Sequence, residues 1–222
     1  FGKSYQERVM AMIGIAHPDF REALFEKAKK SGMIGSERSL GEAVRGVYPV
    51  RLEETVEIED EEITIRPAKP VDERRIQEHY YNLDKEDIFS RFFHEKTSFL
   101  KEEVEGVSQI DYVKDLTIVA VVGEFGFGRV VAIGEYLIDP ATNIAEIAFS
   151  VSKDYQKKGM GKILITKLAS AARENHISGL LAFTSPRNRG MIKLFNELPY
   201  KVHSSFDGDM LTLRCKFDEP AP

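Results

Sequence analysis

The segment from residue 145 to residue 175 places the strongest constraint on the fold of this chain. Residues 145–152 predict a strand, and residues 160–175 repeat apolar side chains at helical spacing, with Gly159 and Gly161 at the junction. A strand that runs through a glycine turn into an amphipathic helix needs a sheet against which the helix can bury its apolar face. The chain is therefore expected to combine a sheet with packed helices.

The glycine turn has the chemical features of an anion site. Unpaired backbone N–H groups and the helix dipole attract negative charge at a helix start, and glycine lets the backbone approach a phosphate closely. Lys157, Lys158 and Lys162 add positive charge. The turn is neither a Walker loop nor the Gly-x-Gly-x-x-Gly dinucleotide motif. From these residues alone, a phosphate site and an ordinary strand-to-helix turn both remain open.

The rest of the chain also alternates strands and helices. From residue 63 the pattern predicts a strand, two helices, three strands, a helix, a strand, a helix and a closing hairpin. This order indicates an α/β (α+β) fold with a mixed sheet. Ser185-Pro186 predicts the N-cap and first turn of the last helix. Residues 1–34 predict two short helices, which have too little core to stand alone.

The acidity of the chain is concentrated in one stretch. The formal net charge is −5, but without seven acids the chain has 29 acids against 31 bases, which leaves +2. Apolar residues alternate on both sides of Asp60-Glu61, which predicts a hairpin. We expect a solvated linker or edge hairpin, with contact to a basic, lysine-bearing acceptor as the alternative. The seven acids are Glu53, Glu54, Glu57, Glu59, Asp60, Glu61 and Glu62.

The composition excludes several other classes of protein. A single cysteine, Cys215, rules out an internal disulfide framework or a multi-cysteine metal site and fits a reducing, cytoplasmic compartment. The histidines lack metal-ligand spacing, so no metal is expected. No apolar run approaches the ~20 residues that span a bilayer, and the negative charge argues against nucleic-acid binding. Because the chain begins with Phe1, we expect a processed chain or a fragment of a longer one.

Two motifs resemble the GNAT superfamily of N-acetyltransferases. Residues 145–151 followed by Gln156-x-x-Gly-x-Gly resemble its acetyl-CoA motif, in which Arg/Gln-x-x-Gly-x-Gly/Ala forms the pyrophosphate loop. Residues 188–195, Asn-x-x-Met-x-x-Leu-Phe, resemble its downstream Asn-x-x-Ala-x-x-Leu-Tyr segment. Two motifs in the correct order are more specific than either alone. The resemblance implies a GNAT-like, mostly antiparallel sheet flanked by helices, with a short N-terminal helical appendage.

Further resemblances imply a domain organisation. Parts of residues 48–93 are similar to the lead-in of protein lysine acetyltransferases of the bacterial Pat type. Residues 1–34 resemble the C-terminal end of the acetyl-CoA hydrolase/CoA-transferase family. Together they imply a helical remnant of an upstream CoA-transferase-like domain at 1–34, a connector and acidic hairpin arm at 35–60, and an acetyltransferase domain at 61–218.

The resemblance implies acetyl transfer from acetyl-CoA, as co-substrate, to an amine, with a protein lysine preferred. Glu146 aligns with the family's glutamate base, and we expect burial beside Ile147 and Phe149 to raise its pKa. The family's proton-donating tyrosine falls at Phe195, so another group protonates the thiolate or it leaves unassisted. The residues implied to contact acetyl-CoA are Phe149, Ser150, Val151, Gln156, Lys157, Lys158, Gly159, Met160, Gly161, Lys162, Asn188 and Phe195.

Two alternatives remain open. In the first, the chain is still an acetyltransferase that uses acetyl-CoA, but the acceptor is a small amine. In the second, the chain is a CoA-binding regulatory module of a fused acetyl-CoA hydrolase/transferase, as the phenylalanine at position 195 and the N-terminal resemblance suggest.

Overall fold

The computed structural model describes residues 5–35, 40, 48–93, 112–123 and 128–221, which divide into two compact units. Of the described residues, those up to Tyr48, with Tyr112 and Val113, belong to the first unit, and the others belong to the second. The stretch from Gly123 to Gly128, whose glycines predict a hairpin turn, lies partly outside the described residues, which leave out 124–127. No helix in the described ranges is long and apolar enough to cross a membrane.

The first unit is a pair of helices, as the sequence predicts. Helix α1 covers Tyr5–Ile15 and helix α2 covers Pro18–Lys30. Gly32 follows with φ +66°, a left-handed conformation that suits glycine at a helix C-terminus. The small core of this unit consists of Met10, Ile13, Phe25, Ala28 and Ile34.

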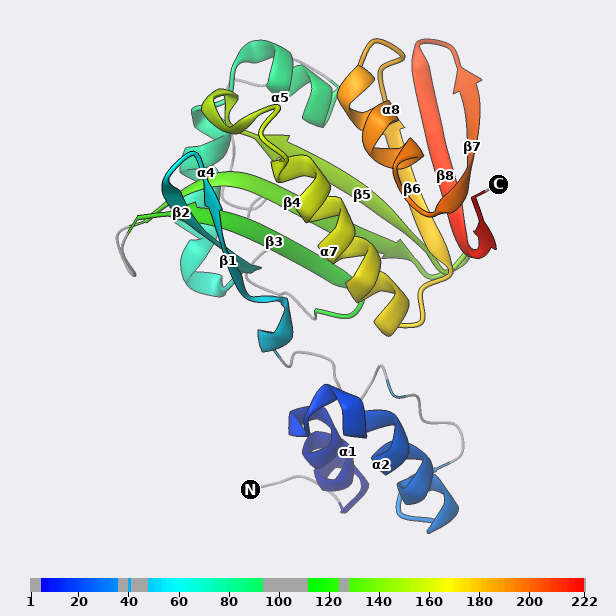
Figure 1. Ribbon diagram of the computed structural model, residues 1–222. Coiled ribbons are helices and arrows are strands. Elements are labelled where there is room, and N and C mark those ends of the chain that lie inside the picture. Colours follow the sequence, from blue (N-terminus) through cyan, green and yellow to red (C-terminus); the bar gives the residue numbers. More distant parts are fainter. Residues whose placement is uncertain (1–4, 36–39, 41–47, 94–111, 124–127, 222) are drawn as a thin grey trace. The chain divides into compact units, whose positions relative to one another are not determined.

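The second unit is built on one eight-stranded sheet in the order β1-β2-β3-β4-β5-β6-β8-β7 (Figure 1). All neighbouring strands are antiparallel except β5 and β6. This mostly antiparallel, mixed sheet confirms the predicted fold class. The strands are β1 Glu54–Ile58, β2 Glu61–Pro67, β3 Asp115–Val122, β4 Arg129–Asp139, β5 Ile144–Val151, β6 Gly179–Thr184, β7 Tyr200–Asp207 and β8 Met210–Pro220.

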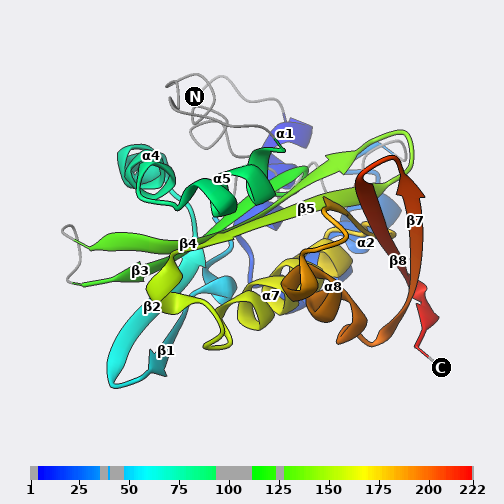
Figure 2. The same ribbon diagram turned by 90° about the horizontal axis from the view of Figure 1, so that it is seen from above.

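Helices lie on both faces of the sheet (Figure 2). One face carries α4 (Glu73–Tyr81) and α5 (Lys85–Phe92), and the other carries α7 (Met160–Glu174) and α8 (Arg189–Asn196). These two helices, α4 and α5, are the pair that the sequence predicts after the first strand, and the break between them falls at Asn82-Leu83-Asp84. Short 3₁₀ turns lie at Val50–Leu52, Pro70–Asp72 and Lys153–Tyr155.

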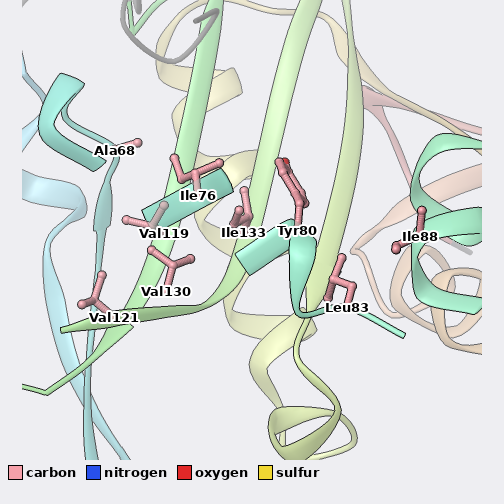
Figure 3. Packing of buried hydrophobic residues seen from close by; sticks show 9 residues of the cluster. All are labelled: Ala68, Ile76, Tyr80, Leu83, Ile88, Val119, Val121, Val130 and Ile133. Carbon is pink, nitrogen blue, oxygen red and sulfur yellow. The ribbon is translucent and has the colours of Figure 1, made fainter. Parts of the chain in front are cut away.

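The core under α4 fixes that helix against the central strands. Ile76 and Tyr80 of α4 point toward Val119 and Ile133 of the sheet (Figure 3). Phe92 packs against the same cluster, with its ring edge-on to Tyr80 at 5.3 Å between centroids. Burial of such side chains contributes about 1.5–3 kcal/mol each.

The acidic stretch forms the predicted edge hairpin. Strands β1 and β2 pair with each other, and Glu59 and Asp60 form the turn with φ of 52° and 64°. Four of its seven acids contact other parts of the second unit. The contacts are Glu53 with Lys69, Glu54 with Lys167, Glu59 with Lys158, and Glu61 with Tyr155.

The start of the last helix differs from the prediction. Asn188, not Ser185, is the N-cap of α8, because its side-chain oxygen accepts a hydrogen bond from the Met191 N–H at 3.0 Å. The Ser185 hydroxyl accepts from the Arg187 N–H in the turn before the helix. Both residues are good caps by type, and only the fold decides which one reaches an unpaired helical N–H.

Candidate active site

The two parallel strands at the centre of the sheet separate partway along their length. β5 and β6 pair only from Ile144 to Glu146 on β5 and from Gly179 to Leu181 on β6. Beyond Glu146, β5 follows β4 to Val151, while β6 follows β8. The edge of β5 that faces away from β4 is therefore left without a partner strand in the described part of the chain.

A cleft of about 750 Å³ opens at this separation. Its walls come from α5, β5, the loop after β5, the start of α7, the end of β6, and α8. Most of the predicted site residues meet here although two separate motifs supply them. Those that line the cleft are Glu146, Phe149, Ser150, Val151, Gln156, Lys157, Gly159, Gly161, Lys162 and Asn188.

Three predicted contact residues do not line the cleft. The Lys158 ammonium is paired with Glu59 of the hairpin turn instead. The Met160 side chain lies on the buried face of α7, so its backbone N–H is the group that remains to serve an anion. The ring of Phe195 has 0% of its surface exposed, because it lies on the core side of α8 while Met191 and Leu194 face the cleft.

The loop between β5 and α7 has an unusual backbone. Lys157 has φ +61° and Gly159 has φ +91°, both in the left-handed region that favours glycine. Gly159 occupies the N-cap position of α7, and no side chain there accepts a hydrogen bond from the first backbone N–H groups of the helix. A Cβ on Gly161 would lie 2.9 Å from Leu194 Cδ1, so the glycine leaves room for the Leu194 side chain of α8 beside the start of α7. An uncapped helix start beside lysines suits an anion.

Gln156 ties this loop to α5. Its Nε2 donates to the backbone oxygen of Val151 at 3.0 Å and to Asp87 Oδ2 at 2.9 Å. Burial raises the pKa of Asp87, and the hydrogen bond from Gln156 partly opposes this. The side chain therefore holds the loop in place, a role the motif alone does not reveal.

His79 ties α4 to the end of β5. Its Nε2 lies 2.9 Å from the Ser150 hydroxyl, and its Nδ1 lies 3.3 Å from the Ser152 hydroxyl. Burial lowers the pKa of His79 to about 4, so the ring is neutral at pH 7. A neutral imidazole has one donor and one acceptor nitrogen, which suits two hydroxyl partners.

Glu146 lies at the point where β5 and β6 part. Its side chain lines the cleft but is exposed, so the prediction that Glu146 is buried by its apolar neighbours is wrong. Alternation along the strand places Glu146 on the same face as the buried Ser150, so the face alone does not determine whether the side chain is exposed. His79 of α4 covers Ser150, four residues further along that face, and this cover does not extend to Glu146.

Several residues that line the cleft are not predicted from the sequence. Ser90, Arg91 and Phe93 come from α5 and its end, and Arg91 is ion-paired with Glu135 of β4. These three residues lie in the stretch 48–93 that resembles the Pat-type lead-in, but that resemblance does not identify them as site residues. Tyr155 also lines the cleft, and its place directly before Gln156 of the motif was a usable signal.

Thr184, at the end of β6, is a further cleft residue missed from sequence. Its side chain is 1% exposed, and its hydroxyl is a buried polar atom without a hydrogen-bond partner among the described residues. Such a hydroxyl suits a ligand that can hydrogen-bond. Together with the uncapped helix start and the open edge of β5, it fits the acetyl-CoA that the resemblance implies.

No group of three or more His, Cys, Asp or Glu side chains within the described ranges is arranged to hold a metal ion. The exposed carboxylate of Glu146, the open edge of β5 and the uncapped start of α7 are among the chemical groups that the cleft does offer. These groups are suited to bind an anionic molecule at one end and to accept a proton at the other.

Comparison with known proteins agrees with this geometry. The model of the acetyltransferase (GNAT) family matches residues 78–198, and that of the acetyl-CoA hydrolase/transferase C-terminal domain matches residues 1–28. An acetyltransferase from Pseudomonas aeruginosa is 28% identical over 129 residues, which cover 58% of this chain and 69% of that protein.

Solved structures share the fold. The GNAT domain of PAT from S. lividans has a TM-score of 0.66 and 27% identity, covering 77% of this chain and 99% of that chain. The yncA protein of Salmonella typhimurium, solved with its cofactor acetyl-CoA, has a TM-score of 0.57 at 19% identity and covers 72% of this chain and 96% of its own. Spermidine N-acetyltransferase from Vibrio cholerae has a TM-score of 0.51 at 16% identity, with coverages of 71% and 96%. Since the family match spans more than half of the 222 residues and includes most of the cleft, the chain belongs to the acetyltransferase (GNAT) family.

Proposed function

We propose that this GNAT-family N-acetyltransferase transfers the acetyl group of acetyl-CoA to a protein lysine, with Glu146 as the general base. The observation that carries the proposal is the position of Glu146, whose carboxylate faces the same cleft as the uncapped start of α7. A proton acceptor and an anion site at two ends of one cleft match the two requirements of the reaction.

The phosphate end of the cleft binds the co-substrate. The backbone N–H groups at the start of α7 face the pyrophosphate, and Lys157 and Lys162 add positive charge. The open edge of β5 from Phe149 to Val151 offers backbone groups to the amides of the pantetheine arm, much as a peptide is added to a sheet.

The reaction end removes a proton from the acceptor. A lysine amine with a pKa near ~10.4 is neutral in only roughly one molecule in 2,500 at pH 7. A positioned base that takes its proton, directly or through water, contributes about 10²–10⁴ in rate. Glu146 does this at the separation of β5 and β6, where an exposed carboxylate remains reachable by an incoming amine.

The neutral amine then attacks the thioester carbonyl. The backbone N–H of Phe149 is the group proposed to polarise that carbonyl oxygen as negative charge develops on it. Phe195 supplies no proton, because a phenyl ring has no acidic proton and because the side chain lies outside the cleft. The coenzyme leaves as a thiolate, which is feasible because thiols ionise near ~8.5.

The preference for a protein lysine rests on two likenesses. Residues 48–93 resemble the lead-in of Pat-type protein lysine acetyltransferases, and the GNAT domain of S. lividans PAT is 27% identical to this chain. An exposed carboxylate at the acceptor end also suits a cationic substrate. A small amine is also cationic at neutral pH and is the second acceptor class to be tested.

A regulatory role is the second candidate function. The match of residues 1–28 to the acetyl-CoA hydrolase/transferase C-terminal domain favours it, because it implies a fused CoA enzyme upstream. In that case the cleft would bind acetyl-CoA and report its level without transferring the acetyl group.

Mass spectrometry with isotope-labelled acetyl-CoA distinguishes these functions. The chain is incubated with lysine-bearing protein and peptide acceptors in one arm and with spermidine and other small amines in another. Labelled acetyl-lysine is the expected product. Acetylation of small amines alone would replace the acceptor class, and binding of acetyl-CoA without any acetylated product would support the regulatory role against the proposed one.

A further inference from the structure

The turn of the acidic hairpin contacts the loop that leads into the phosphate site. The hydroxyl of Tyr155 donates to Glu61 Oε2 at 2.6 Å and accepts from Arg129 Nη2 at 2.8 Å. Tyr155 is 5% exposed and lines the cleft directly before Gln156. Burial raises the pKa of Tyr155, so its hydroxyl keeps the proton that it donates to Glu61.

A second contact lies beside the first. Lys158 is ion-paired with Glu59, the first residue of the hairpin turn. The Lys158 ammonium and the Arg129 guanidinium lie 5.9 and 5.4 Å from the centroid of the Tyr155 ring, within the range of a cation–π contact. Glu59 of the turn and Glu61, the first residue of β2, thus contact two residues of the loop, and the tyrosine ring takes part in both contacts.

These contacts join segments that are distant in sequence. Glu61 and Tyr155 are 94 residues apart, and Glu59 and Lys158 are 99 apart. The loop that contains Tyr155 and Lys158 also contains two residues with positive φ, Lys157 and Gly159. The surrounding structure must hold this backbone in place. A hydrogen bond to a charged group is about twice as strong as a neutral one, so the pair at Tyr155 is a suitable restraint.

We propose that the β1–β2 turn is a working part of the acetyl-CoA site. Glu61, Arg129 and Tyr155 are positioning residues that hold the phosphate loop in its binding conformation, and Glu59 holds Lys158 on the outer side of that loop. The inference rests on the proposed function, because it assumes that the loop binds acetyl-CoA. It gives the acidic stretch an internal role, in place of the contact with a basic acceptor that its charge suggested.

Calorimetric titration with acetyl-CoA alone, in the absence of an acceptor, tests this role. Tyr155→Phe removes the hydroxyl and both of its hydrogen bonds but keeps the ring. Since a preformed loop binds more tightly than one that must be ordered, we expect the dissociation constant for acetyl-CoA to rise about fivefold or more. Glu61→Ala should have a similar effect, whereas Glu61→Gln should recover most of the affinity because its amide oxygen still accepts from Tyr155.

Tyr136→Phe is the matched control. The Tyr136 hydroxyl is also buried and hydrogen-bonded, accepting from Asn175 Nδ2 at 2.7 Å, but Tyr136 does not line the cleft. It should lose stability like Tyr155→Phe and retain the affinity of the unmodified chain for acetyl-CoA. A generic loss of stability therefore cannot imitate the expected result.

The double variant Tyr155→Phe/Glu61→Ala completes the test. If the two residues act through one contact, it should bind acetyl-CoA about as weakly as either single variant. Affinity of Tyr155→Phe equal to that of the unmodified chain, or strictly additive losses in the double variant, would overturn the inference while leaving the proposed function intact. Failure of the unmodified chain to bind acetyl-CoA would instead overturn the proposed function and this inference with it.

Discussion

The two ends of the cleft differ in how they are held. At the phosphate end, contacts from several other elements fix β5 and the loop after it: His79 of α4, Asp87 of α5, and Glu61 of β2. At the reaction end, Glu146 is exposed at the separation of two strands, and Phe93 at the end of α5 is also exposed. Several contacts thus hold the end of the cleft that would bind the co-substrate, whereas the end at which an acceptor must enter is exposed.

This difference has a physical reason. A phosphate site that is formed before the ligand arrives avoids the cost of ordering a loop on binding. An acceptor protein must reach the carboxylate, so that end cannot be covered in the same way. Changes at the phosphate end should therefore alter affinity for acetyl-CoA or stability, and changes at the reaction end should alter turnover.

The largest effect is expected from Glu146→Gln at the reaction end. The amide keeps the size of the side chain but cannot take up a proton from the acceptor amine, so kcat should fall about 100-fold or more. Glu219→Gln is the control, because Glu219 lies on β8, contacts His203 and does not line the cleft. Equal turnover of Glu146→Gln and the unmodified chain would remove Glu146 from the role of base.

The next effect concerns His79 and the stability of the phosphate end. Its pKa of about 4 in the folded chain lies below the ordinary 6.5, so the unfolded chain binds more protons between these values. Stability should therefore fall as the pH drops from about 6.5 toward 4, by on the order of 2 kcal/mol.

Urea unfolding at pH 7 and pH 4.5 measures this dependence. His79→Asn removes the titrating ring, so its difference in unfolding free energy between the two pH values should be smaller than that of the unmodified chain by about the same amount. Comparison of the two proteins cancels the carboxylates that titrate in the same range. An identical pH dependence in both proteins would show that His79 is not the group responsible.

Gly159→Ala should weaken acetyl-CoA binding. A Cβ at φ +91° costs roughly 1–2 kcal/mol, and relief of that strain would change the shape of the loop. We expect the KM for acetyl-CoA to rise about tenfold. Gly208→Ala is a matched control in the β7–β8 turn, since Gly208 also has positive φ and an added Cβ meets nothing within 4 Å at either position. It should lower stability without altering that KM.

The smallest effect is expected from Thr184→Val, and its two parts have opposite signs. Removing a buried hydroxyl that has no hydrogen-bond partner among the described residues should raise stability by about 1 kcal/mol. The same hydroxyl is expected to hydrogen-bond the bound co-substrate, so affinity for acetyl-CoA should fall a few-fold. Thermal unfolding and calorimetric titration measure the two quantities. A gain in stability with no loss of affinity would show that Thr184 does not contact acetyl-CoA.

Local patterns explain what could be predicted from the sequence. The order of strands and helices, the break at residues 82–84 and the hairpin around Asp60 all follow from short-range periodicity and turn residues. Most of the predicted cofactor contacts line one cleft because two motifs place them at the end of β5 and the start of α8. Each of these features depends on residues that are close in sequence.

Contacts between residues that are far apart in the sequence explain what could not be predicted. The contacts of His79 with Ser150 and of Asp87 with Gln156 join residues 71 and 69 positions apart, and nothing in either segment identifies its partner. The exposure of Glu146 depends on where α4 ends its cover of the sheet, which periodicity along β5 does not determine.

The central claim is that one end of the cleft binds acetyl-CoA and the other end serves the reaction. The same binding measurement on one variant from each end tests it. It is the dissociation constant of acetyl-CoA for Glu146→Gln and for Gly159→Ala, measured by calorimetry without an acceptor. Glu146→Gln should bind within about twofold of the unmodified chain, because a base that acts only in the transition state adds little to ground-state binding. Gly159→Ala should bind about tenfold more weakly. Equal weakening in both variants, or unchanged binding in Gly159→Ala, would contradict this division.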